Sequence, residues 1–206
     1  MHIYAGMSAG GGLFSGCYAR WTFTLKGVAY ITGAGSGIGT HTAYSMARQG
    51  TVKGLRRIFP EVSAQAFELD VTDEKAVNES IAQTVKEFGR LDYAVNNAGV
   101  GGIINTTDQI PKEDFEKVVA VNTIALTVSY HSNRGSSVNV ASMLGFVAPP
   151  LNVPTTAYAT SKHAVIGLTN SDALALLIKA FESMPLLQAS YIVGATLVAD
   201  GGDTIV

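Results

Sequence analysis

Cysteine is nearly absent from this sequence of 206 residues, which has only Cys17. A single cysteine excludes a disulfide within the chain and is compatible with a reducing compartment, so we expect a cytoplasmic protein. No apolar run approaches the roughly 18 to 20 residues that a membrane span needs. The first residues also lack the basic and apolar regions of a signal peptide, so neither a membrane nor a secretory route is expected.

The chain also has no large excess of positive or negative charge. The 14 Lys and Arg residues against 16 Asp and Glu give a formal net charge of −2, which offers no basic surface to nucleic acid. The four histidines have no metal-ligand spacing with each other or with Cys17, so we expect no metal site. With 47% hydrophobic residues the chain can fill the core of one domain, which we place at residues 23–206. Residues 1–22 are small and rich in glycine, and are expected to form a flexible extension.

Strand and helix patterns alternate along the chain. This predicts an α/β fold, a Rossmann-like doubly wound parallel sheet with helices on both faces. The predicted strands are Gly27–Thr32, Gln65–Leu69, Tyr93–Asn96, Ser137–Ala141 and Ala195–Ala199. Helical patterns lie between them, over about 40–49, 72–88, 111–122 and 158–181. One or two of the usual strands are expected to be missing, because no strand-like run follows the first helix or lies between the helix that begins near Tyr158 and Tyr191.

The turn between the first strand and the first helix is rich in glycine. It reads T-G-x-x-x-G-x-G, with glycines at Gly33, Gly37 and Gly39. Such a turn lets backbone N–H groups and a helix N-terminus approach a pyrophosphate with no Cβ in the way. A tight turn with a purely structural role is the alternative that the glycines alone leave open.

A second set of residues carries proton chemistry. Tyr158 and Lys162 stand at i and i+4, one turn apart on the same face of a predicted helix. A lysine ammonium at about 4 Å favours the phenolate form, which suits a tyrosine to general acid–base catalysis. Ser142 directly follows a predicted strand, at the edge where open α/β sheets place their ligands. A chance Tyr-x-x-x-Lys pair on an amphipathic helix is the alternative for the first two residues.

These segments together resemble the short-chain dehydrogenases/reductases. The resemblance is carried by the glycine turn, Asp70-Val71, Asn96–Gly99, Asn122, Ser142 and the Tyr158/Lys162 pair, and covers about residues 25–167. The tail Gly194–Gly202 also resembles the last strand of that family. The resemblance implies hydride transfer between NAD or NADP and a secondary alcohol or its ketone.

The resemblance also implies a role for each matching residue. The cofactor-binding residues would be Gly33, Ser36, Gly37, Ile38 and Gly39 at the pyrophosphate and adenosine ribose, Asp70 and Val71 at the adenine, and Asn97, Ala98 and Gly99 beside the ribose. Tyr158 would exchange a proton with the substrate oxygen, to which Ser142 would donate a hydrogen bond. Lys162 would assist Tyr158 and bind the nicotinamide ribose, and Tyr158 would also contact the cofactor. Asn122 would hold a water that completes a proton relay through Lys162.

The departures from the family are specific. No Asp or Glu stands between Gly39 and Glu61, where an acid or base usually selects NAD or NADP. With no Arg or Lys inside the glycine turn, we expect NAD. No Pro-Gly follows the catalytic helix, and the segment after Asn122 is short, so the family's usual homo-oligomer is in doubt. The uncharged segment Met143–Leu151 predicts a small apolar or weakly polar alcohol or ketone as substrate, although the same residues could simply pack on the sheet.

Two other interpretations remain beside an active oxidoreductase. The chain could be a catalytically impaired dinucleotide-binding or interaction protein that arose from this family by loss of segments. It could also be a fragment that does not fold stably alone. The complete set of Asn122, Ser142, Tyr158 and Lys162 favours the enzyme, and the missing strands favour the other two interpretations.

Overall fold

The computed structural model describes residues 2–7, 27–48, 63–126 and 136–183. The predicted strand Ala195–Ala199 lies outside them. The chain divides into two compact units. The first comprises Met1–Gly99 with Ile124–Val138, and the second comprises Val100–Thr123 with Asn139–Val206. A single domain over residues 23–206 stays a prediction.

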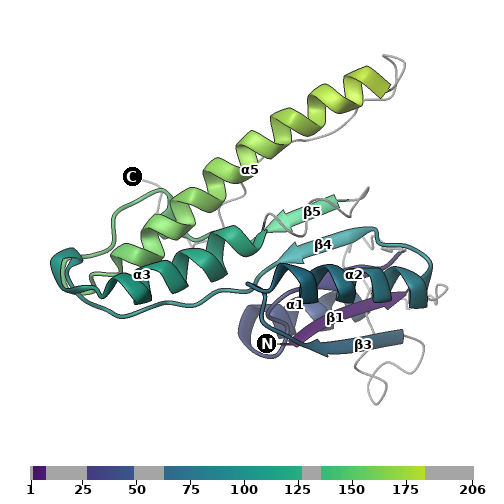
Figure 1. Cartoon of the computed structure of the whole chain (residues 1–206), viewed down its shortest axis with the longest axis horizontal. Helices are drawn as coiled ribbons and strands as arrows, with labels where there is room; N and C mark the ends of the chain where they lie inside the picture. Colours follow the sequence, from purple (N-terminus) through teal and green to yellow (C-terminus); the bar gives the residue numbers. More distant parts are fainter. Residues whose placement is uncertain (1, 8–26, 49–62, 127–135, 184–206) are drawn as a thin grey trace, which may run out of the picture. The chain divides into compact units, whose positions relative to one another are not determined.

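A five-stranded sheet forms the centre of the first unit, with the strand order β3-β1-β2-β4-β5 (Figure 1). The strands are β1 (His2–Met7), β2 (Ala29–Ile31), β3 (Ser63–Glu68), β4 (Tyr93–Asn96) and β5 (Ser136–Asn139). β2 and β4 run parallel, with Tyr30 opposite Ala94. The predicted α/β fold is confirmed, and β2 to β5 lie within a few residues of their predicted positions.

β1 is the strand that the sequence analysis did not foresee. Residues 1–22 are expected to be flexible, whereas residues 2–7 pair antiparallel with two strands, Tyr4 lying opposite both Ile31 and Ala66. In a doubly wound sheet this place beside the glycine-turn strand belongs to a second parallel strand. No strand-like run follows the first helix to fill it. β1 takes the place instead and gives the inner N–H and C=O groups of β2 and β3 their partners.

Two helices of the first unit follow the sequence closely. They are α1 (Gly37–Arg48) and α2 (Glu74–Phe88). The Asp73 side chain caps α2 by accepting from the backbone N–H of Ala76 at 3.0 Å. Gly89 ends the helix in the left-handed region, with φ of 78°. The apolar face of α2 joins β2 in a buried cluster formed by Val28, Tyr30, Val77, Ile81 and Phe88. Helix and sheet are therefore held together by burial of apolar surface.

The second unit contains two helices that contact one another, α3 (Lys112–Val119) and α5 (Thr156–Ser183). A π-helical turn, Ala120–Ile124, directly follows α3. A short 3-10 turn, Met143–Gly145, also lies against α5. A Cβ at Gly145 would come within 2.8 Å of the Lys162 carbonyl oxygen, so this contact requires glycine.

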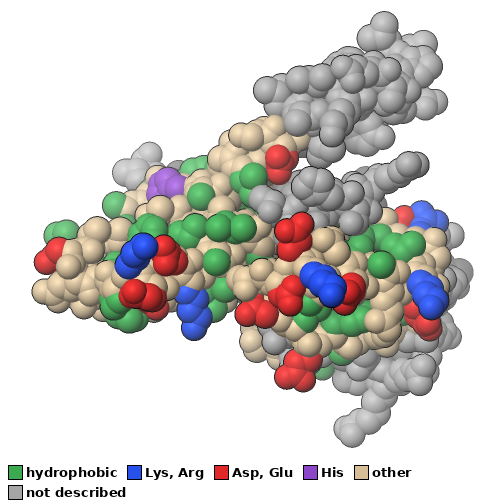
Figure 2. All heavy atoms as spheres, in the orientation of Figure 1, with side chains coloured by type: hydrophobic (Ala, Val, Ile, Leu, Met, Phe, Trp, Pro, Cys, Tyr) green, Lys and Arg blue, Asp and Glu red, His purple; other side chains and the backbone are tan. Residues whose placement is uncertain are grey.

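The outer faces of α2 and α3 carry acidic and basic side chains together (Figure 2). Lys75 and Glu79 are 3.8 Å apart on α2, and Lys112 and Glu116 are 3.4 Å apart on α3. Both pairs are exposed and one helical turn apart, so each stabilises its helix by about 0.3–0.5 kcal/mol. Among the described residues, no helix is both long and apolar enough to cross a membrane.

Candidate functional site

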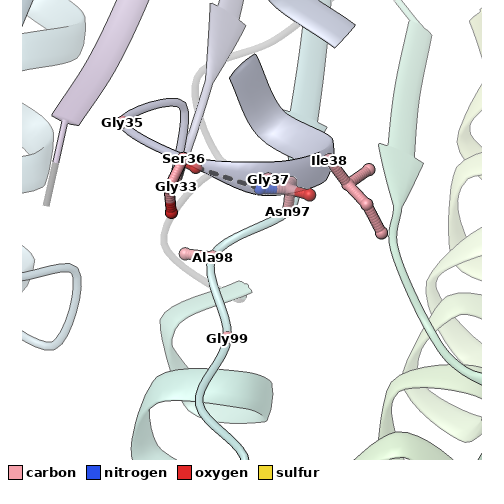
Figure 3. A pocket seen from close by; sticks show the side chains of 8 residues that line it. All are labelled: Gly33, Gly35, Ser36, Gly37, Ile38, Asn97, Ala98 and Gly99. Carbon is pink, nitrogen blue, oxygen red and sulfur yellow. Dashed lines mark hydrogen bonds between the residues drawn. The ribbon is translucent and has the colours of Figure 1, made fainter. Parts of the chain in front are cut away.

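A cavity of about 530 Å³ lies over the turn that joins β2 to α1 (Figure 3). Its lining comes from this turn and from the segment after β4: Gly33, Gly35, Ser36, Gly37, Ile38, Asn97, Ala98 and Gly99. α1 begins at Gly37, so its first N–H groups lie at the cavity and have no carbonyl one turn earlier to pair with. These free donors and the positive end of the helix dipole favour an anion here.

The turn is held in place by one threonine and one asparagine. Thr32 Oγ1 accepts from the backbone N–H groups of Asn97 and Ala98, each at 3.0 Å. The Asn97 side chain returns the contact, donating from Nδ2 to the carbonyl of Thr32 at 3.0 Å. Nδ2 also donates to the Gly33 carbonyl at 3.3 Å (Figure 3). The ends of β2 and β4 are thereby fixed to one another. Sequence reasoning gave Thr32 no role, because its only signal was its place just before the glycines.

The three glycines of the motif are required for different reasons. Gly33 has φ of +67°, and a Cβ there would come within 2.9 Å of Ala98 Cα. Gly39 has no such φ, but a Cβ would collide with the Gly33 carbonyl oxygen. Gly37 has φ of +54°, and nothing lies within 4 Å of its Cβ position. The free space over Gly37, at the start of a helix, fits the approach of a pyrophosphate.

Seven of the twelve predicted cofactor residues line this cavity, and Gly39, Asp70, Val71, Tyr158 and Lys162 do not. Gly39 is buried and packs under the turn, whereas Gly35 lines the cavity although the sequence analysis gave it no role. Asp70 is exposed, and its carboxylate accepts from the backbone N–H and the hydroxyl of Thr72, each at 2.9 Å. Val71 is 2% exposed and belongs to the core. That Asp70 and Val71 contact an adenine stays a prediction.

Lys162 lies in the second unit, where all four predicted catalytic residues belong. Its side chain on α5 is buried, with 4% of its surface exposed. Nζ donates to the carbonyl oxygen of Val140 at 2.7 Å and stands 5.6 Å from the centre of the Tyr158 ring. Burial lowers the pKa of Lys162 from 10.5 to about 8, because a charged amine loses its hydration there.

Asn122 lies in the π-helical turn with 1% of its surface exposed. Its Oδ1 accepts from the backbone N–H of Val100 at 2.8 Å. Its Nδ2 donates to the Val100 carbonyl at 3.0 Å and to Ser161 Oγ at 3.0 Å. Both protons of the amide are therefore used in hydrogen bonds within the second unit.

Ser142 and Tyr158 differ from these two residues, because their hydroxyl protons are not committed. Ser142 Oγ accepts from the backbone N–H of Leu144 at 3.3 Å and so caps the 3-10 turn. Within the part of the chain that the structure describes, neither the Ser142 nor the Tyr158 hydroxyl donates to an acceptor. Both side chains are half-buried. Each can therefore give its proton in a hydrogen bond to a ligand oxygen.

Comparison with known proteins identifies the family. A family model described as short chain dehydrogenase matches residues 27–180, which is most of the chain. The chain belongs to the short-chain dehydrogenase family. Relatives support this at 30% identity and above. The short-chain dehydrogenase srdC of Neurospora crassa is 35% identical over 73% of this chain and 69% of its own length. The cyclohexanol dehydrogenase of an Acinetobacter species is 32% identical over 71% of this chain and 66% of its own.

Three similar solved structures agree with the fold. Levodione reductase has a TM-score of 0.61 at 29% identity, covering 69% of this chain and 63% of the other. An NAD⁺-bound xylitol dehydrogenase has a TM-score of 0.51 at 34% identity, covering 54% of this chain and 45% of the other. ElxO, solved with NADP bound, has a TM-score of 0.50 at 35% identity, covering 55% and 48%. The chain spans about two thirds of the length of the two curated relatives above, and less of these solved chains.

Proposed function

We propose that this short-chain dehydrogenase is an NAD(P)-dependent oxidoreductase that interconverts a secondary alcohol and its ketone. The observation that carries the proposal is the Tyr158–Lys162 pair, in which a buried amine stands 5.6 Å from the ring of a tyrosine whose hydroxyl donates to no acceptor among the described residues. A tyrosine hydroxyl placed beside a lysine can act as a general acid–base, which exchanges a proton with a ligand oxygen. The family supplies the reaction type, and the cavity over Gly37 supplies a place for an anionic cofactor.

Each catalytic residue then has one task. The Tyr158 hydroxyl gives its proton to the ketone oxygen during reduction and takes it back during alcohol oxidation. The Ser142 hydroxyl donates a hydrogen bond to the same oxygen and stabilises negative charge that develops on it. The Lys162 ammonium stabilises the phenolate that Tyr158 becomes after losing its proton. The bound dinucleotide supplies or accepts the hydride.

The cofactor residues of the first unit are proposed to hold the dinucleotide by its pyrophosphate. Gly37 and Ile38 begin α1 and present backbone N–H groups, while the missing side chain at Gly37 leaves the phosphate room. NAD is proposed over NADP because residues 33–39 contain no Arg or Lys that could pair with a 2′-phosphate. Both cofactors occur among similar solved structures, of which one holds NAD⁺ and another NADP.

The substrate is proposed to be a small, weakly polar cyclic alcohol or ketone. The segment after Ser142 carries Phe146, Leu151 and Val153, which are 48%, 101% and 40% exposed. Large apolar side chains left exposed on the segment that follows Ser142 suit a substrate with an apolar body. Two relatives point to the same class, because their names are cyclohexanol dehydrogenase and levodione reductase.

A second candidate is a dinucleotide-binding protein without turnover. The strand that should follow α1 and carry the residue that selects the cofactor is missing from the sequence. The chain also covers only about two thirds of the curated relatives it matches. A protein of this kind would bind the cofactor through the glycine turn and catalyse nothing.

The deciding experiment is a titration of the purified chain with NADH and NADPH, followed by nicotinamide fluorescence. Micromolar, saturable binding together with oxidation of cyclohexanol and reduction of cyclohexanone supports the oxidoreductase. Binding without turnover of either compound favours the second candidate. Binding of neither cofactor overturns both.

A matched pair of variants shows whether the cofactor phosphate lies over the glycine turn. Gly37→Asp and Gly37→Asn place side chains of nearly equal size in the same free space, and both residue types tolerate a positive φ. Only the aspartate repels an anion. We expect Asp to weaken NADH binding at least tenfold more than Asn. Equal losses would place the phosphate elsewhere.

A further inference from the structure

Ser161 and Asn122 form a buried hydrogen bond that the proposed reaction does not use. Ser161 is fully buried, and its Oγ donates to the main-chain carbonyl of Tyr158 at 2.7 Å. The same oxygen accepts from Asn122 Nδ2 at 3.0 Å. A serine hydroxyl has one proton, and here that proton is directed to Tyr158. Towards Asn122 the oxygen can therefore act only as an acceptor.

This acceptor helps to fix the orientation of the Asn122 amide. Its two Nδ2 protons go to Ser161 Oγ and the Val100 carbonyl, while Oδ1 accepts from the Val100 N–H. If the amide turned over, Oδ1 would face the lone pairs of Ser161 and the Val100 carbonyl. All three hydrogen bonds would then be lost in a place that water does not reach. Ser161 and Val100 thus select the same orientation.

A second contact ends at the same residue. Thr123 Oγ1 donates to the main-chain carbonyl of Ser161 at 3.1 Å. Two successive residues of the π-helical turn, Asn122 and Thr123, therefore bind Ser161, one at its side chain and one at its backbone. Ser161 stands between Tyr158 and Lys162 on the same turn of α5. Single π-helical turns within helices occur often at functional sites, because they redirect a few residues without ending the helix.

We infer that Ser161 is a positioning residue, which acts through Asn122 to hold the π-helical turn against the turn of α5 that carries Tyr158 and Lys162. Its hydroxyl touches no substrate or cofactor. The effect of Ser161 on turnover rests on the proposed function, whereas its effect on the Asn122 amide does not.

The chain offers a matched control on the same helix. Ser171 Oγ also donates to a main-chain carbonyl of α5, that of Gly167, at 2.9 Å. Ser171 is exposed, and its hydroxyl contacts no second partner among the described residues. Ser161→Ala and Ser171→Ala therefore remove the same kind of bond within the helix, but only the first removes a bond to Asn122.

The first test follows the Asn122 side-chain amide by NMR hydrogen exchange and needs no turnover. We expect Ser161→Ala to speed the exchange of these protons at least tenfold, and Ser171→Ala to leave it unchanged. Should Ser161→Ala fail to fold, Ser161→Cys keeps nearly the same volume with a weaker acceptor. For the cysteine variant we expect at least threefold faster exchange. Unchanged exchange in the folded Ser161 variant overturns the inference.

The second test is a double-mutant cycle on kcat, with cyclohexanol as the probe. We expect Ser161→Ala to lower kcat about tenfold while the dissociation constant for NADH stays within twofold. In the background of Asn122→Ala, the same change is expected to alter kcat less than twofold, because Ser161 acts through Asn122. An equal tenfold loss in both backgrounds overturns the inference. A native chain without turnover refutes the proposed function instead, and the exchange experiment then decides the role of Ser161.

Discussion

The glycine turn of the first unit and the catalytic residues of the second differ in how the sequence builds them. At Gly33, Gly37 and Gly39 the useful property is a missing side chain, because the backbone comes close to itself or leaves space for a ligand. At Tyr158 and Lys162 the useful property is the side chain itself. Lys162 Nζ has a fixed partner in the Val140 carbonyl, and the Tyr158 hydroxyl donates to no acceptor in the described part of the chain. Substitutions in the turn should therefore act on stability and cofactor binding. Those in the second unit should act on proton transfer.

The largest effect is expected from Tyr158→Phe, which removes one oxygen. Because that oxygen carries the proton, kcat for cyclohexanol oxidation should fall by about 10²- to 10⁴-fold. The dissociation constant for NADH should stay within about twofold, since the glycine turn is untouched. Steady-state kinetics and the fluorescence titration measure the two quantities. Turnover that survives the change would contradict the assigned chemistry.

Alanine at the three motif glycines should separate conformational from steric cost. Gly33→Ala meets both a positive φ and the nearby Ala98 backbone, so the free energy of unfolding should fall by about 2–4 kcal/mol. Gly37→Ala meets only the φ cost, about 1–2 kcal/mol. Gly39→Ala meets only a steric cost, from the Gly33 carbonyl and Asn97 Nδ2, of about 1–3 kcal/mol. Urea unfolding gives these values, and Gly101→Ala, which has space and no positive φ, is the neutral control. A Gly33 loss no larger than that of Gly37 would show that the close approach does not matter.

The buried Lys162 should make stability rise with pH. Burial lowers its pKa to about 8 in the folded chain, from 10.5 when solvated. Between these two values the unfolded chain holds the proton and the folded chain does not, so raising the pH favours the folded state. Across this window the gain is about 3 kcal/mol. Urea unfolding of the native chain and of Lys162→Met at pH 7.5 and 10.5 measures it as the difference between the two. Identical pH profiles would be inconsistent with a buried amine.

The smallest effect tests the side chain that holds the glycine turn. Thr32→Val removes the oxygen that accepts from Asn97 N and Ala98 N, and leaves these N–H groups unpaired beside a residue that is 6% exposed. The expected loss in the free energy of unfolding is about 2 kcal/mol, with weaker NADH binding. Thr32→Ser keeps the oxygen and should lose less than about 1 kcal/mol. A loss for Val no larger than that for Ser would show that the bonds to Thr32 Oγ1 contribute no more to stability than its methyl group does.

Local signals in the sequence predicted much of this fold. The helix predicted over about 72–88 is α2, whose N-cap in the structure is Asp73 and whose left-handed C-cap is Gly89. The strands around the glycine turn were found because apolar runs there are bounded by turn residues. The family was found because six separate segments agree in order and spacing. The helix and the strands depend on residues that are close in the sequence, and the family match depends on the known order and spacing of its motifs.

The features that escaped prediction depend on contacts between distant residues. β1 has no alternation of polar and apolar residues and lies in a glycine-rich stretch, so only its pairing with β2 and β3 defines it as a strand. The burial of Gly39 depends on the Gly33 carbonyl, and the role of Thr32 on N–H groups beyond β4. Nothing in the sequence marks Ser161, which directly precedes Lys162. Its role follows from its contact with Asn122, which lies in the π-helical turn. The pattern and spacing of residues along the sequence carry no information on contacts between such distant residues.

The place of β1 in the sheet has a consequence during synthesis on the ribosome. All the backbone pairing of β3 in the described sheet is with β1, and β1 separates it from β2. β1 is made first, yet its partners lie far downstream, since Tyr4 pairs with Ile31 and Ala66. Until residue 66 has emerged, the strand has at least one unpaired edge, and such edges pair readily with other chains. Slow translation of the segment between β2 and β3 should therefore favour aggregation of the nascent chain, and faster translation there should favour the native sheet.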